Sequence, residues 1–208
     1  MAQVSDLFTR ADENPLSDDG KWVKNTQMGL TGTLQLVSNT ARSVSPLPYF
    51  PAHYVRNDVN AGATQFSKVK VGYKSAGTGY VQAFICGPGS NATVNGYQLW
   101  NAGLAEFRIY RIDSNVGTQL AADFGTALAT GDVLLLVLEG GVVKGYQNGN
   151  LIVSASDATY SGGYPAMLLY NGDTTPADIT ISEFYGGDGT DWTGGGASAV
   201  PLLMQHYN

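Results

Sequence analysis

The sequence predicts an all-β protein, a two-sheet antiparallel β-sandwich, and three observations lead to this expectation. Gly (27) and Pro (8) together make up 35 of the 208 residues. Glu occurs only four times, so long surface helices have little material. Short alternating segments separated by Gly, Asn, Asp and Pro recur from end to end, which is the spacing of a sandwich or jelly roll. The length fits one such domain.

The expected strands follow from this alternation and from the turn residues between them. Lysine and valine alternate over 68–71, and charged and apolar residues alternate over 106–109, so each strand has one wet and one dry face. Residues 133–138 are apolar throughout, which indicates a central strand covered on both sides. Asn148-Gly149 between two β runs predicts a tight hairpin. In chain order, the expected strands are 7–10, 21–25, 33–38, 41–45, 53–56, 64–73, 80–86, 96–101, 105–112, 119–122, 133–138, 142–147, 151–155, 166–170 and 179–185.

Two regions break this rhythm. The prolines within 46–51 cannot donate to a β-ladder, so this segment is expected on an edge or in a surface loop. A Gly-rich hinge at 194–196 separates the sandwich, residues 1–193, from an apolar peptide within 194–208 that is expected to dock on this chain or on another. The docking side chains would be Leu202, Leu203, Met204 and Tyr207. The expected core residues are Val69, Val71, Phe107, Ile109, Leu134 and Leu136.

Charge and composition exclude several classes of partner. Eleven basic and seventeen acidic residues give a net charge of −6. The sequence contains no Lys/Arg cluster, so nucleic acid and anionic membranes are not expected partners. One cysteine and two histidines allow neither an intramolecular disulfide nor a structural zinc site. The N-terminal residues lack a basic and then apolar pattern, so the chain is expected to be made in a cytoplasm without an export signal.

Several stretches carry a family resemblance. They are 7–16, 20–22, 107–112, 131–133, 147–149, 157–160, 163–166 and 181–188. They resemble concanavalin A-like jelly-roll domains of the laminin-G-like type over roughly residues 6–192, which implies that the first and last strands pair. Stand-alone domains of this kind resemble proteins of tailed-phage genomes. The resemblance therefore implies a virion location as a decoration protein or adhesion module, with virion proteins, its own subunits in a homo-oligomer or cell-surface polysaccharide as partners.

The sequence shows no catalytic signature. A retaining glycosidase needs two carboxyl groups about 5 Å apart, yet Glu106 and Glu139, the two closest glutamates, are 33 residues apart. The usual nucleophile, phosphate-loop and zinc-protease motifs are missing. We therefore expect a non-enzymatic, glycan-binding protein. Two alternatives stay open: a polysaccharide-cleaving enzyme that pairs Glu139 with a cross-strand Asp, and a purely protein-binding scaffold.

No cofactor is expected, with calcium left open because relatives of this fold hold an ion in their loops. Asp173, Asp188 and Asp191 lie in Gly-rich loops and offer the hard oxygen ligands that calcium prefers. If the terminal strands pair antiparallel, Asp188 falls near Asp6. The alternative is that these carboxylates cap local turns.

Aromatic residues supply the remaining functional signal. Twelve Tyr and three Trp offer amphipathic rings suited to stacking on sugar faces or to anchoring protein interfaces. Rings in or beside irregular segments are the expected ligand platforms, although a ring near a turn also serves as a packing lid. His53 is expected at the surface. The candidate ligand-binding rings are Tyr49, Tyr54, Tyr97, Trp100, Tyr160 and Tyr164.

Overall fold

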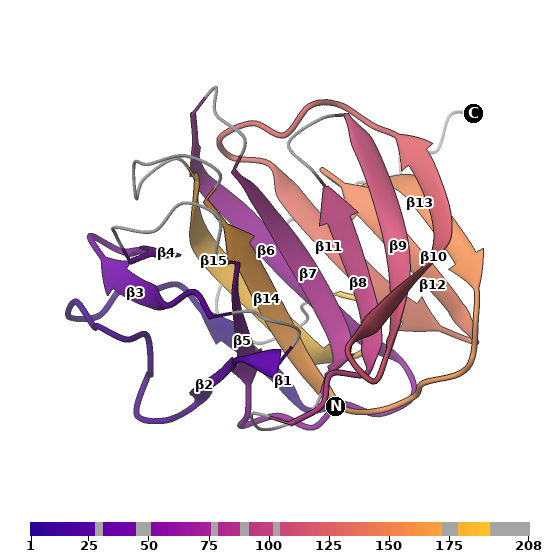
Figure 1. Cartoon of the computed structure of the whole chain (residues 1–208), viewed down its shortest axis with the longest axis horizontal. Coiled ribbons are helices and arrows are strands. Elements are labelled where there is room, and N and C mark those ends of the chain that lie inside the picture. Colours follow the sequence, from indigo (N-terminus) through magenta and orange to yellow (C-terminus); the bar gives the residue numbers. More distant parts are fainter. Residues whose placement is uncertain are drawn as a thin grey trace, which may run out of the picture.

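The computed structural model describes residues 1–27, 31–44, 51–75, 79–87, 92–101, 105–171 and 179–191. Within these ranges the chain forms fifteen β-strands and no α-helix. The strands build two antiparallel sheets stacked one over the other (Figure 1). The all-β, two-sheet sandwich expected from the sequence is therefore confirmed. The described residues include no helix long and apolar enough to span a membrane.

Sheet A holds eight strands, and every pairing in it is antiparallel. Seven of these strands form a continuous order across the sheet, and the eighth strand, β1, pairs with β15 outside that order. The main order, from one edge to the other, is β13 (Asn150–Ser156), β12 (Val142–Gln147), β11 (Val133–Glu139), β6 (Gln65–Lys74), β15 (Ile179–Asp188), β4 (Thr40–Ser43) and β3 (Leu34–Val37), with β1 spanning Gln3–Asp6.

Sheet B holds seven strands, also paired antiparallel throughout. Its order is β10 (Val116–Phe124), β9 (Glu106–Asp113), β8 (Gly96–Asn101), β7 (Tyr80–Gly87), β14 (Tyr164–Tyr170), β5 (Ala52–Arg56) and β2 (Trp22–Asn25). Sequential hairpins such as β11-β12-β13 and β7-β8-β9-β10 alternate with pairs from distant parts of the sequence, such as β6 with β15 and β5 with β14. Most contacts in the fold are long-range.

The core fills the space between the sheets, and its position follows from the two-residue period of the strands. All six residues expected in the core are buried, with exposed fractions of 0–1%. Hydrogen bonds between polar groups also link the two sheets. For example, the Ser67 hydroxyl on β6 donates to the carbonyl of Ala166 on β14 at 2.9 Å, which ties one sheet to the other.

Two local expectations are confirmed. Asn148 and Gly149 join β12 to β13 as a tight turn, and both have positive φ, 52° and 81°. That backbone conformation favours Asn and Gly. The apolar strand β11 lies between β12 and β6, inside sheet A. On its outward face Val137 is 98% buried, whereas Val133 and Leu135 are half-buried, so the central position is confirmed and the cover on the outward face is partial.

The first strand differs from the expectation. It spans Gln3–Asp6, not 7–10, because the chain turns at Phe8, whose φ is +54°. It still pairs with the last strand, as expected. The register places Asp6 opposite Phe184 and Gly187 opposite Gln3, so Asp188 does not fall near Asp6. That expectation was wrong by about four residues, because the sequence does not fix where the first strand begins.

A buried carboxylate, Asp6, anchors this end of the sandwich. Its Oδ1 accepts hydrogen bonds from the backbone N–H of Phe8 and from Arg10 Nη1, both at 2.7 Å. Its Oδ2 accepts from the Trp22 indole at 2.7 Å and from Arg56 Nη1 at 3.4 Å. Four donors, two from the segment after β1, one from β2 and one from β5, thus share one acceptor group on β1. The network joins β1, which belongs to sheet A, to two strands of sheet B.

Candidate functional site

The outer face of sheet B carries the side chains that alternate with its core residues. On β7, Val81, Ala83 and Ile85 point into the core, so Tyr80 and Gln82 project outward. The same alternation on β8 sends Leu99 inward and Gln98 and Trp100 outward. Cross-strand pairing then brings these side chains together, because Gln98 lies opposite Tyr110 on β9 and Gln82 lies opposite Leu168 on β14. A solvent-facing sheet surface is usually polar, whereas this one is rich in aromatic rings.

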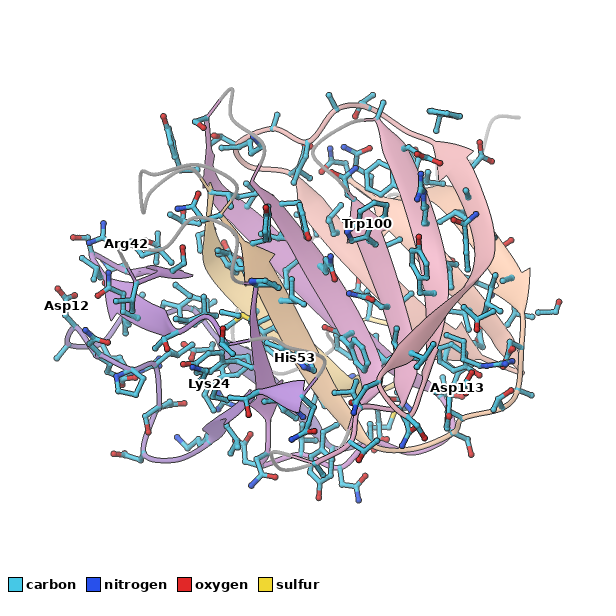
Figure 2. The ribbon with its side chains drawn as sticks, in the orientation of Figure 1. Asp12, Lys24, Arg42, His53, Trp100 and Asp113 are labelled. Carbon is cyan, nitrogen blue, oxygen red and sulfur yellow. The ribbon has the colours of Figure 1, made fainter. Side chains whose placement is uncertain are left out.

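A pocket of about 260 Å³ opens in the middle of this face. In Figure 2, Trp100 lies over the central strands of sheet B, at this pocket. The pocket combines aromatic rings, two carboxamides and a few aliphatic groups, which is the usual make-up of a small-molecule site. The lining residues are Pro51, Tyr80, Gln82, Gln98, Trp100, Tyr110, Ile112, Gly117 and Leu168.

Trp100 is the centre of an aromatic cluster. Tyr80 and Tyr110 both meet its ring edge to face, with centroids 6.1 Å and 5.9 Å away. Tyr170 stacks on Tyr80 with a centroid distance of 4.5 Å. These contacts are the preferred geometries of aromatic pairs and fix the orientation of the rings. The pocket therefore offers rigid apolar surfaces, half-exposed to solvent.

Two glutamines form the polar part of the pocket. Gln82 and Gln98 are buried, and the amide nitrogen of Gln98 donates to the amide oxygen of Gln82. Both side chains line the pocket. A buried carboxamide that is held in place by a neighbour presents its remaining donor or acceptor in a fixed direction.

The charge beside the pocket is compensated locally. The guanidinium of Arg108 lies 4.8 Å from the centroid of the Trp100 ring, a cation–π contact. Its Nη2 donates to Glu106 at 2.7 Å, and its Nη1 donates to the Tyr110 hydroxyl at 3.3 Å. The hydrogen bond with Arg108 lowers the pKa of Glu106, and the same bond raises the pKa of Arg108. Burial raises the pKa of Tyr80, so this phenol stays protonated at neutral pH.

Of the six rings expected to bind ligand, Tyr54 and Tyr97 are not exposed. Both lie in the core between the sheets, with exposed fractions of 1% and 0%. The Tyr54 hydroxyl accepts from the Leu34 N–H at 3.2 Å, and the Tyr97 hydroxyl donates to Asp157 at 2.7 Å. The expectation that these rings offer a surface platform was wrong, because each occupies the inward-facing set of its strand.

The other four rings have different positions. Trp100 lies in the pocket. Tyr160 packs edge-on against Tyr97, and its hydroxyl donates to Asp113 at 2.7 Å, so it is held as part of a loop network. Tyr164 packs against a small apolar cluster on the outer face of sheet B. Tyr49 lies outside the described residues. A ligand-binding role for each of the four stays a prediction.

The acidic residues proposed for calcium already have partners. The carboxylate of Asp188 accepts from the backbone N–H of Gly62 at 2.5 Å and of Ala2 at 2.8 Å. Asp191 pairs with Lys68. Among the described residues, no group of three or more His, Cys, Asp or Glu side chains is arranged to hold a metal ion. Asp173 lies outside the described residues, as do Leu202, Leu203, Met204 and Tyr207.

Two further side chains bear on chemistry. Glu139, the candidate acid, is 49% exposed and pairs with Lys144 on sheet A at 2.8 Å. It therefore lies away from the pocket on sheet B. His53 is buried on β5 with its ring centroid 5.0 Å from that of Phe84, and burial lowers its pKa to about 4. The expectation of a surface histidine was wrong.

Sequence reasoning selected only Trp100 among the nine residues that line the pocket. The missed residues that supply its other rings and its amides are Tyr80, Gln82, Gln98 and Tyr110. A signal for two of them was present. In the segment 80–85, the aliphatic residues 81, 83 and 85 form one alternating set, and Gln82 indicates that the other set faces solvent. The ring of Tyr80 belongs to this solvent-facing set and is therefore a surface ring, not the core residue that its size suggests.

Comparisons with known proteins place this architecture. No protein-family model matches the sequence, and no curated protein matches it. Among solved structures, the carbohydrate-binding module CBM66 from Bacillus subtilis aligns with a TM-score of 0.58 at 16% identity, covering 83% of this chain and 96% of that one. The exoplasmic/lumenal domain of VIP36, bound to calcium and mannose, aligns at 0.59 with 11% identity, covering 83% and 86%.

A Bacillus subtilis protein described as having a galectin-like fold aligns with a TM-score of 0.57 at 10% identity, covering 84% of this chain and 91% of that chain. These neighbours are lectin-like β-sandwiches, consistent with the expected concanavalin A-like jelly roll. At these identities the likeness concerns the fold. The function has to be argued from the site itself.

Proposed function

We propose that this protein binds glycans through the pocket on the outer face of sheet B. The observation that carries the proposal is the ring cluster of Trp100, Tyr80 and Tyr110 around the amides of Gln82 and Gln98. The C–H faces of a sugar ring are apolar and pack on aromatic faces, whereas its hydroxyl groups need hydrogen-bond partners. The pocket supplies both kinds of contact within one small volume.

The structural neighbours support this proposal. One is a carbohydrate-binding module, and another was solved with mannose bound. They share the sandwich with this chain, so the proposal does not require an unusual use of the fold.

A glycan array followed by titration of the best ligand tests the proposal. Trp100→Ala removes the central ring and should weaken binding at least about tenfold, which is about 1.4 kcal/mol. The matched control is Tyr73→Ala, since Tyr73 is an exposed ring on β6 of sheet A and its loss should leave affinity unchanged. Both variants should keep the wild-type melting temperature to within a few degrees. Wild-type binding to no glycan, or equal effects of the two variants, would contradict the proposal.

We also propose that binding occurs without cleavage. No carboxylate lines the pocket among the residues that define it, and Glu139 is engaged by Lys144 on the other sheet. Incubation with the bound polysaccharide should release no reducing sugar. Turnover that disappears in Glu139→Gln would show that the protein is instead an enzyme.

The cellular context is a separate part of the proposal. The resemblance to stand-alone domains of tailed phages supports display of the glycan-binding face on a virion, with the apolar peptide at 200–207 attaching the domain to other virion proteins or to its own copies. Detection of the chain in purified particles tests the location. Deletion of residues 197–208 should release the domain from its oligomer or particle without lowering its melting temperature.

A further inference from the structure

We infer that the pocket selects an uncharged sugar residue, and that Gln82 and Gln98 read two of its hydroxyl groups. The inference rests on the proposed glycan binding and adds to it the class of ligand and the residues that determine specificity. Three observations support it: the two amides are buried, their mutual hydrogen bond leaves one amide nitrogen and one amide oxygen available, and the pocket is lined by uncharged side chains.

The two glutamines are placed by the sheet itself. Gln82 projects from β7 opposite Leu168, and Gln98 projects from β8 between Phe84 and Tyr110. Their exposed fractions are 2% and 9%, which is low for glutamine. Since buried amides are costly unless they are hydrogen-bonded, two adjacent buried amides at the bottom of a pocket need a reason.

The mutual hydrogen bond engages one of the two amide nitrogens and one of the two amide oxygens. Gln98 donates from its amide nitrogen to the oxygen of Gln82, which leaves the amide nitrogen of Gln82 and the amide oxygen of Gln98. Within the part of the chain that the structure describes, neither of these atoms has a protein partner. If both amides were turned over, the hydrogen bond would reverse, and the pair would still offer one donor group and one acceptor.

One donor next to one acceptor matches a pair of neighbouring sugar hydroxyls. Each hydroxyl both donates and accepts, so one can accept from the NH₂ group while the next donates to the carbonyl oxygen. A ligand without these hydroxyls would leave buried amide groups unpaired, and sites built in this way discriminate strongly against such ligands. The aromatic rings hold the sugar, and the amide pair decides which sugar is accepted.

The pocket offers no charge to a ligand. No Asp, Glu, His, Lys or Arg side chain is among the residues that line it. Arg108, whose guanidinium lies over the Trp100 ring, has its Nη groups on Glu106 and on the Tyr110 hydroxyl, and its Nε is buried. A carboxylate brought into this pocket would lose its hydration without gaining a cationic partner. Sugars that carry a carboxylate, such as uronic acids, are therefore disfavoured.

Matched ligand pairs test the charge selection directly. In each pair, methyl glucoside with methyl glucuronide and methyl galactoside with methyl galacturonide, a carboxylate replaces the CH₂OH group at C6 and the ring hydroxyls are unchanged. Binding is measured by ligand-observed NMR, in competition with the best glycan of the array. For whichever ring the pocket accepts, the neutral member should bind at least tenfold more tightly than the uronic acid.

Paired substitutions test the amides. The double variant Gln82→Met with Gln98→Met replaces both partners by apolar side chains of similar length, so its stability should stay close to that of the wild type. Its affinity for the neutral sugar should fall at least tenfold. Gln35→Met, which changes a half-buried glutamine on β3 of sheet A, is the control and should bind like the wild type.

The outcomes separate this inference from the proposed function. If the protein binds no glycan at all, glycan binding fails and the inference fails with it. If it binds glycans in a Trp100-dependent way but prefers the uronic acids, or if the folded double variant keeps full affinity, glycan binding stands and the inference is overturned. A neutral preference that is lost in the double variant supports both.

Discussion

Replacing Asp6 by alanine removes the acceptor that four donors share. Arg10 keeps Glu13 as a partner at 2.6 Å, and Arg56 keeps Asp58 at 2.7 Å. The indole of Trp22 and the backbone N–H of Phe8 have no other hydrogen-bond acceptor among the described residues. Each buried donor left unpaired costs about 1–3 kcal/mol, and breaking a buried ion pair from one side costs about 3–5 kcal/mol. We therefore expect Asp6→Ala to destabilise the domain by about 3–5 kcal/mol.

Urea unfolding followed by tryptophan fluorescence measures this loss, because Trp22 lies beside the site. In a thermal scan, the same loss corresponds to a fall in melting temperature of about 6–20 °C for a domain of this size. The control is Asp191→Ala, which removes an exposed carboxylate paired with Lys68 and should cost less than about 1 kcal/mol. A loss below about 1 kcal/mol in Asp6→Ala, with an unchanged dependence on urea, would refute the view that this carboxylate joins the two sheets.

Three further expectations follow from the packing and the charges. Leu136→Ala should cost about 2–5 kcal/mol in urea unfolding because the side chain is fully buried, and a loss below about 1 kcal/mol would place it outside a packed core. Gly187→Ala should detach β1, since a Cβ there would collide with the backbone of Ala2 and φ is +132°; faster amide hydrogen exchange in β1 checks this. Burial would raise the pKa of Glu13, but hydrogen bonds from Arg10 and from the backbone at 17 and 18 outweigh it and lower that pKa from 4.5 to about 2. The stabilisation from Glu13 should thus be complete above about pH 4.5 and lost as the pH falls towards 2. The difference in unfolding free energy between the wild type and Glu13→Gln should therefore decrease over that pH range. A difference that does not change with pH would contradict the lowered pKa of Glu13.

The sequence was sufficient to predict the sandwich and its core because one of the two alternating faces of most strands is plainly apolar. Val69 and Val71 alternate with lysines, and Leu134 and Leu136 lie in a strand with no polar face at all. Such patterns are set by burial alone. The position of the first strand was not predictable in this way, because 3–6 is short and has little alternation. Its place depends in part on Asp6 meeting the side chains of Trp22 and Arg56, which lie 16 and 50 residues away in the sequence.

The site was only partly predictable, for a related reason. Trp100 was identified as a candidate, but Tyr54 and Tyr97 were assigned to the surface because they lie near irregular segments. Within a strand, the direction of a ring depends on its place in the alternation, not on the nearest loop. The meeting of Gln82 with Gln98 depends on the pairing of β7 with β8, and the sequence of either strand alone says nothing about that register.

The pairing of β1 with β15 determines how the domain can be attached to a larger structure. The first and last strands of the sandwich are neighbours in sheet A, whereas the proposed glycan-binding pocket opens on the outer face of sheet B. A tether joined beside this strand pair therefore holds the domain by one layer and leaves the opposite layer unobstructed. Several copies anchored in this way on one support would present their pockets outward together. Pockets with low individual affinity would then bind a polysaccharide with high avidity through many simultaneous contacts.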